Sequence, residues 1–89
     1  MKTIWKYEIT PALNEIEIPI NAEFLSLHTK NGLPCMWFLV ETENSREFRR
    51  FEVYGTGHEI NVSMFQRNFI GTFLVNYDSL VFHVFEKTG

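Results

Sequence analysis

The chain has 89 residues, 16% of them aromatic, and a formal net charge of −3. This length fits one domain over residues 1–89, and the acidic balance gives no basic surface of the kind that duplex nucleic acid requires. No stretch approaches the ~20 apolar residues of a membrane-spanning helix, and the first residues lack the apolar segment of a signal peptide. We therefore expect a cytoplasmic protein with no membrane partner.

The first third of the chain alternates between apolar and polar residues with a period of two, which predicts β-strands. Strands are expected over residues 3–9 (TIWKYEI), 15–20 (EIEIPI) and 23–30 (EFLSLHTK). The alternation in the second of these turns Ile20 inward and Pro19 outward. Because proline cannot donate to a ladder, this strand is predicted to lie at a sheet edge.

The dipeptide Asn31-Gly32 predicts a tight hairpin turn. The strand after it, residues 34–41 (PCMWFLVE), is apolar on both faces, which is typical of a central strand. Of its residues, we expect Trp37 and Leu39 in the core.

Three more strands are predicted, over residues 46–54, 69–76 and 80–86, with a turn at 77–79 and a frayed end at 87–89. A short helix or 3₁₀ turn is expected only at residues 62–67.

Two positions in the later strands predict irregular pairing. Strict alternation puts Phe48 and Phe51 on opposite faces of one strand, which suggests a bulge there. Gly71 interrupts a run of β-formers and indicates a bend or a close approach of another segment.

Strands about every ten residues predict an all-β fold with little helix, either a compact antiparallel β-sandwich or a partly open small barrel of about 6–7 strands. Exposed edge strands leave a homo-oligomer open. The predicted core comprises Trp5, Ile16, Ile18, Leu25, Leu27, Trp37, Leu39, Phe51, Val53, Phe73 and Phe82.

The stretch at residues 46–60 (REFRRFEVYGTGHEI) holds three of the four arginines and the Gly-Thr-Gly-His segment. Backbone N–H groups of a glycine-rich turn can converge on an anion, and arginine suits phosphate. We expect a small anionic ligand such as a nucleotide here, with Tyr54 or Trp5 stacking on its ring. The predicted ligand-binding residues are Arg49, Arg50, Tyr54, Gly55, Thr56, Gly57, His58 and Arg67.

A plainer interpretation of the same stretch stays open. The glycines suit a tight connection after a strand, since no Gly-x-Gly-x-x-Gly pattern follows. Glu47, Glu52 and Glu59 interleave with the arginines, so cross-strand salt bridges would account for the charges as well.

Catalytic and metal signatures are weak. Cys35 lies in an apolar run, which indicates a buried and inert thiol. His28, His58 and His83 have no spacing typical of zinc ligands. We expect a non-enzymatic protein without a metal or a cofactor.

The segments KTIWKYEI, NGLPCMWFLVE, FEVYGTGHEI and LVFHVFE resemble a set of small uncharacterised phage and prophage proteins over nearly the full chain. That family brings no established activity. The resemblance implies a phage-encoded accessory protein in the host cytoplasm, with counter-defence as one role, by titrating a host nucleotide signal or by blocking a host protein.

Two other functions remain open. The first is an inhibitor that binds a host protein through an acidic face, with Glu15, Glu17 and Glu41, and an exposed strand edge. The second is a structural virion component.

Overall fold

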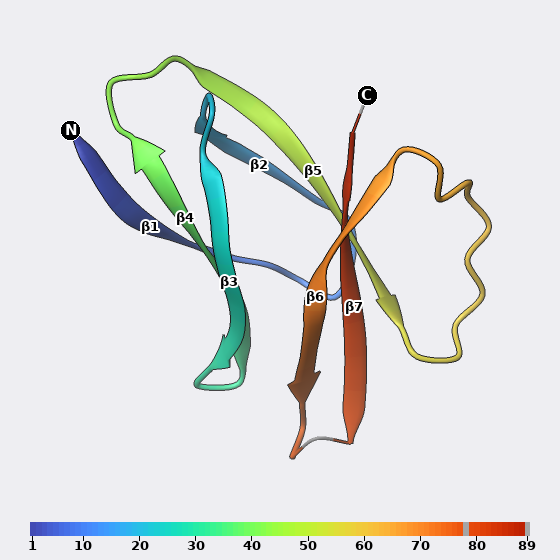
Figure 1. Ribbon diagram of the computed structural model, residues 1–89. Helices are drawn as coiled ribbons and strands as arrows, with labels where there is room; N and C mark the ends of the chain where they lie inside the picture. Colours follow the sequence, from blue (N-terminus) through green and yellow to red (C-terminus); the bar gives the residue numbers. More distant parts are fainter. Residues whose placement is uncertain (78, 89) are drawn as a thin grey trace.

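The computed structural model describes residues 1–77 and 79–88, and within them it has seven strands and no helix (Figure 1). The strands are β1 (Lys2–Glu8), β2 (Asn14–Pro19), β3 (Glu23–Lys30), β4 (Leu33–Glu41), β5 (Arg46–Gly55), β6 (Arg67–Val75) and β7 (Leu80–Lys87). All seven predicted strands are confirmed, with bounds shifted by two residues at most. In the described part of the chain, no helix is long and apolar enough to cross a membrane.

The strands form two antiparallel sheets, with orders β1-β4-β3 and β2-β5-β7-β6. The sheets meet along β3 and β6, where the Thr29 hydroxyl donates to the Leu74 carbonyl oxygen at 2.8 Å (Figure 1). This seam has no backbone ladder, so the fold is sandwich-like and not a closed barrel. β2 lies at an edge, as Pro19 predicted.

Both predicted hairpins are present. Asn31 and Gly32 have φ values of 51° and 79°, which a two-residue turn of the primed type requires, and Lys30 lies opposite Leu33. The β6–β7 hairpin pairs Val75 with Leu80.

The core is one cluster between the sheets, with Phe38 at 0% exposure near its centre. The rings of Tyr7, Phe24 and Phe51 contact Phe38 edge-on, with centroids 5.8, 5.6 and 6.1 Å away. Such edge-to-face contacts let a small domain bury large rings densely. The buried apolar residues are Ile9, Ile16, Ile18, Ala22, Met36, Phe38, Val40, Phe51, Phe73 and Val84.

The predicted core face of β4 was wrong. Met36, Phe38 and Val40 point inward, whereas Trp37 and Leu39 lie on the outer face. The register explains this, because Phe38 pairs with Trp5 on the inner face of β1. The outer face also receives Leu25 of the predicted core, which is 44% exposed.

Alternation also failed where β2 ends. Pro19 is fully buried and Ile20 is 38% exposed, the reverse of the prediction. The chain leaves the sheet here: Ala22 N–H donates to the Pro19 carbonyl, and Asn21 has a φ of 68°. The two-residue period holds only while the strand continues.

Bulges occur in other strands than β5. The pairing register shifts by one residue between Phe24 and Ser26 in β3, and again between Phe69 and Gly71 in β6. The second confirms that Gly71 marks an irregular point, where an added Cβ would lie 3.1 Å from Leu27. Phe48 needs no bulge because it is simply exposed, at 69%.

Three smaller predictions concern turns and ends. The expected helix at residues 62–67 is absent, since these residues form turns that end where β6 begins at Arg67. Lys87 does not fray but belongs to β7. Asp78 of the predicted turn and Gly89 of the predicted frayed end lie outside the described residues.

The β3–β4 turn predicts a specific cost. Gly32→Ala should lower the free energy of unfolding by about 1 kcal/mol, because a Cβ disfavours positive φ. Gly32→Asn should cost less, since asparagine tolerates this region. Urea unfolding of the three proteins measures both values, and equal losses for alanine and asparagine would contradict the backbone explanation.

Candidate functional site

Five of the eight predicted site residues gather around one pocket, which we call the loop pocket. It has a volume of about 310 Å³. It lies on the outer face of the four-stranded sheet, where the chain leaves β5. Its lining residues are Tyr54, Gly55, Thr56, Gly57, His58, Ile60, Phe69, His83 and Phe85.

The segment Gly55–His58 forms a tight turn. His58 N–H donates to the Gly55 carbonyl at 3.1 Å, and Gly57 has a φ of 85°, as the third position of a type II turn requires. The His58 ring packs on Gly55, where a Cβ would lie 2.7 Å from ring atoms. Thr56 N–H donates to the Val81 carbonyl at 3.0 Å. Two of the N–H groups expected to converge on an anion are therefore bonded within the chain.

Aromatic rings line one side of the loop pocket. Phe85 lies between Tyr54 and Phe69, with ring centroids 6.1 and 5.4 Å away. Phe69 is 60% exposed, which leaves its ring accessible to a flat ligand. Phe69, Phe85, Ile60 and His83 were not predicted as site residues, because they reach the pocket only through the pairing of β6 with β7 and the course of the loop.

His83 is held by two threonines. The Thr56 hydroxyl lies 2.7 Å from its Nε2, and the Thr72 hydroxyl lies 3.0 Å from its Nδ1. Both ring nitrogens therefore have a hydrogen-bond partner. The ring can orient the loop over the sheet, since Thr56 belongs to the loop and Thr72 to β6.

Arg49 is partly buried and points toward the core. Its guanidinium donates two hydrogen bonds to the Glu86 carboxylate, at 2.6 and 2.8 Å, and one to the Ala22 carbonyl at 2.7 Å. It also lies over the Phe38 ring, 5.1 Å from the centroid. The hydrogen bond to Glu86 raises the pKa of Arg49. This predicted ligand residue is committed to the core.

Arg67 is likewise paired. It donates to both oxygens of Glu52, at 2.5 and 3.1 Å, and to the Ser63 carbonyl at 2.6 Å. The Tyr54 hydroxyl donates to the same carboxylate at 3.0 Å. The bond from Arg67, and secondarily the bond from Tyr54, lowers the pKa of Glu52 although burial opposes this.

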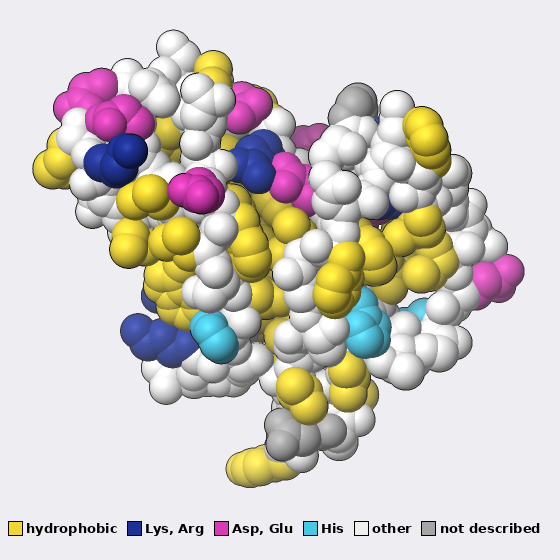
Figure 2. Space-filling view, in the orientation of Figure 1, with side chains coloured by type: hydrophobic (Ala, Val, Ile, Leu, Met, Phe, Trp, Pro, Cys, Tyr) yellow, Lys and Arg dark blue, Asp and Glu magenta, His cyan; other side chains and the backbone are white. Residues whose placement is uncertain are grey.

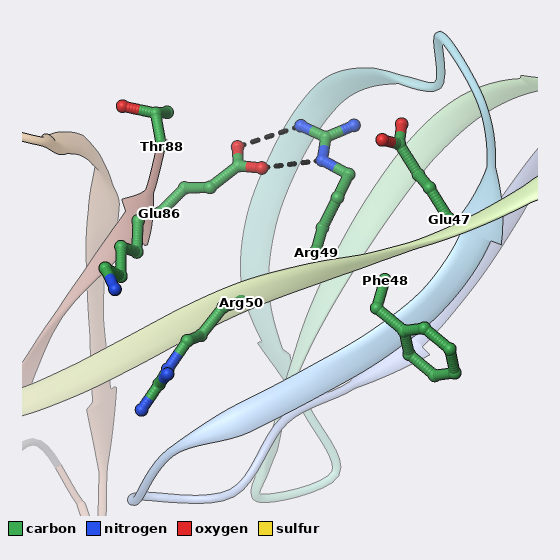
Figure 3. A pocket seen from close by; sticks show the side chains of 7 residues that line it. Glu47, Phe48, Arg49, Arg50, Glu86 and Thr88 are labelled. Carbon is green, nitrogen blue, oxygen red and sulfur yellow. Dashed lines mark hydrogen bonds and ion pairs between the residues drawn. The ribbon is translucent and has the colours of Figure 1, made fainter.

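Arg50 is the predicted arginine that lines open space and has no ion pair among the described residues. A notch of about 450 Å³ lies where β7 ends beside β5, and we call it the arginine notch. Figure 3 shows Arg50 and Phe48 on one side of β5 and Arg49 with Glu86 on the other. Arg50 Nε is buried without a hydrogen-bond partner in the described structure. The notch is lined by Glu47, Phe48, Arg49, Arg50, Glu86, Lys87 and Thr88.

Lys87 joins Arg50 by strand register. Arg50 lies opposite Lys87, and Lys87 lies opposite Arg67, so three cations share one row across β5, β7 and β6. Glu15 on β2 is the neighbour of Arg50 on its other side. Sequence reasoning missed Lys87 because it sits 37 positions from Arg50 and near the end of the chain.

The cysteine and the third histidine lie away from both the loop pocket and the arginine notch. Cys35 is 1% exposed, which confirms the predicted buried thiol. His28 lies on the outer face of the three-stranded sheet, apart from the loop pocket that holds the other two histidines. In the described ranges, no three His, Cys, Asp or Glu side chains gather in a way that could hold a metal ion.

The fold and these sites define a small antiparallel β-sandwich protein with an aromatic pocket on the outer face of one sheet and, beside β5 and β7, a notch lined by both basic and acidic side chains. Residues 1–89 match the family described as a domain of unknown function, DUF7352, and the chain belongs to that family. Comparison with curated proteins and with solved structures gives no match.

The Arg49–Glu86 pair predicts an asymmetric response to mutation. Glu86→Gln should cost about 3 kcal/mol of stability, because it leaves a partly buried guanidinium without its counter-charge. Replacing both residues, as Arg49→Met with Glu86→Leu, should recover most of that loss. Urea unfolding of the wild type, Arg49→Met, Glu86→Leu and the double variant completes a double-mutant cycle that measures the coupling. Equal losses in the single and double variants would refute it.

The lowered pKa of Glu52 predicts acid sensitivity. Because its folded pKa lies below its unfolded value of about 4.3, the ionised carboxylate stabilises the fold at neutral pH. That contribution is lost as the pH falls through the folded pKa. Glu52→Gln should therefore flatten the acid side of the stability curve. Glu17→Gln, at an exposed position on β2, should leave its slope unchanged.

Proposed function

We propose that the protein is a non-enzymatic binding protein for a small anionic ligand with an aromatic ring, such as a nucleotide. The observation that carries the proposal is the position of Arg50 and Lys87, which line the arginine notch, on the same sheet face as the aromatic side chains of the loop pocket. The ring of the ligand would occupy the loop pocket, and its anionic group would bind Arg50 and Lys87.

Strand register supports the spacing. Along β5 and β7, the row of Arg50 and Lys87 is followed on the same face by Phe85 opposite Glu52, which is itself paired with Arg67, and then by Tyr54 opposite His83. Successive residues on one face of a strand are roughly 7 Å apart. The aromatic wall is thus one step from the cations, within reach of their long side chains.

The ion pairs of the arginines decide which of the predicted cations can bind the anion. Arg49 and Arg67 are each bonded to a carboxylate, whereas Arg50 and Lys87 have no ion pair among the described residues. Two cations directly opposite each other repel, so an anion between them would relieve that repulsion. The proposal therefore keeps Arg50 and adds Lys87.

We propose binding without catalysis because the potentially reactive side chains, His83 and Cys35, are hydrogen-bonded or buried. Both His83 nitrogens bond threonine hydroxyls, and Cys35 is buried in the other sheet and does not line the loop pocket. A phage accessory role in the host cytoplasm, with counter-defence by nucleotide titration, rests only on the resemblance of segments such as residues 51–60. We keep it as part of the proposal.

The alternative of a host-protein inhibitor has one structural support. Glu15 and Glu17 project outward from β2, an edge strand able to accept another strand. Glu41 lies in the other sheet, where its carboxylate contacts the Met1 amine. The acidic face would therefore comprise the two β2 glutamates alone.

A nucleotide panel in thermal unfolding tests the main proposal. A ligand at 100 times its dissociation constant should stabilise the fold by about 2.7 kcal/mol, which raises Tm by about 10 °C or more for a domain of this size. Arg50→Ala or Lys87→Ala should remove most of this shift by removing the anion contact. Phe69→Ala should weaken it by removing the ring contact.

Lys6→Ala is the matched control, because this lysine is exposed on the other sheet. It should leave the shift intact. The absence of any shift with nucleoside mono- and triphosphates and cyclic nucleotides would overturn the proposal. Capture of a host protein, abolished by Glu15→Lys with Glu17→Lys, would favour the inhibitor instead.

A further inference from the structure

The outer face of the three-stranded sheet has an uncovered apolar centre, which we call the apolar face: Ile4, Leu25, Trp37 and Leu39. Ile4 is 55% exposed and Leu25 is 44% exposed. Figure 2 shows hydrophobic side chains gathered over this sheet, with charged side chains around them. An antiparallel sheet that packs on one side only normally turns polar residues to solvent on the other. This sheet therefore has the composition of a sheet that is covered on both faces.

Charges flank the apolar face on its two edge strands. On β1, Lys2 and Lys6 stand on either side of Ile4, and Glu8 follows. On β3, Glu23 stands at one end and Lys30 at the other. All five charged side chains are exposed, and none of them forms an ion pair within residues 1–77 and 79–88.

We infer that the apolar face binds a second copy of this chain about a twofold axis parallel to β4. Such an axis keeps each residue row and exchanges the edges, so that β1 of one copy faces β3 of the other. Ile4 and Glu23 both pair with Leu39 and thus share a row. Glu23 of the second copy would then lie opposite Ile4, between Lys2 and Lys6.

The same axis matches the charges at the other end of the sheet. Glu8 and His28 both pair with Cys35, so they share a row as well. Glu8 of each copy would face His28 of the second copy, with Lys30 beside it. Both acidic edge residues, Glu23 and Glu8, thus meet lysines or a histidine of the second copy, twice by symmetry. Glu41 of β4 would lie on the axis, and it keeps the Met1 amine of its own chain as its partner. This self-complementarity is why a second copy is the occupant we choose.

The size of the face sets the strength of the dimer. Three strands of about seven residues cover roughly 400 Å² per copy, or about 800 Å² in total, which is below the ~1,000 Å² of a stable specific interface and fits a weak one. The dimer should therefore dissociate on dilution. The inference does not depend on the proposed ligand, because the loop pocket and the arginine notch belong to the other sheet.

Charge reversal with rescue tests the axis. In sedimentation measurements over a wide concentration range, the wild-type chain should associate into dimers. Glu23→Lys should raise the dissociation constant about tenfold or more, because like charges would then face each other. Lys2→Glu with Lys6→Glu should do the same. A mixture of the two variants should restore dimers, since each opposed pair then has opposite signs.

The exposed position of these residues keeps the fold intact, and circular dichroism verifies this for each variant. Glu17→Lys on the other sheet is the control and should dimerise like wild type. A wild-type chain that stays monomeric throughout would overturn the inference. So would a mixture that associates no better than each variant alone, because that result excludes the proposed pairing of β1 with β3.

Discussion

The partly buried pair of Arg49 and Glu86 is the interaction on which the arrangement of this molecule depends. It joins β5 to β7 within one sheet. The same guanidinium bonds the Ala22 carbonyl just before β3 and lies over Phe38 of the opposite sheet. One side chain therefore ties both sheets together at this end of the core. Arg49 must keep Glu86, because a buried charge without its partner costs far more stability than the replacement of both charges by apolar side chains.

This constraint also decides which cations can serve a ligand. Arg49 is bonded to Glu86, and Arg67 is bonded to Glu52 next to the loop that follows β5. Neither guanidinium is therefore free to bind a ligand. Arg50 follows Arg49 along β5, and Lys87 lies between Arg50 and Arg67 in their row, so Arg50 and Lys87 lie opposite each other beside open space. The Arg49–Glu86 pair and the candidate anion site thus arise from the same arginine-rich segment. Because neighbouring residues of a strand point to opposite faces, Arg49 points toward the core and Arg50 toward the outer face.

The two sheet faces differ in character. The outer face of the four-stranded sheet combines aromatic rings, threonine-held His83 and cations, which suits a small mixed-character ligand. The outer face of the three-stranded sheet is apolar at its centre and charged at its edges, which suits a broad, flat partner. A domain of 89 residues can carry both because each sheet needs only its inner face for the core.

Local chemistry by itself determined the seven strands, the Asn31-Gly32 turn, the edge position of β2 and the all-β class. Alternation, positive φ and the missing proline donor act within a few residues, so they can be read from the sequence. The face that β4 turns inward could not be read, since both faces are apolar and the register with Trp5 decided it. The partners of Arg49 and the meeting of Arg50 with Lys87 were likewise decided by pairing between distant strands. Such pairing depends on the packing of the whole chain, which no local pattern encodes.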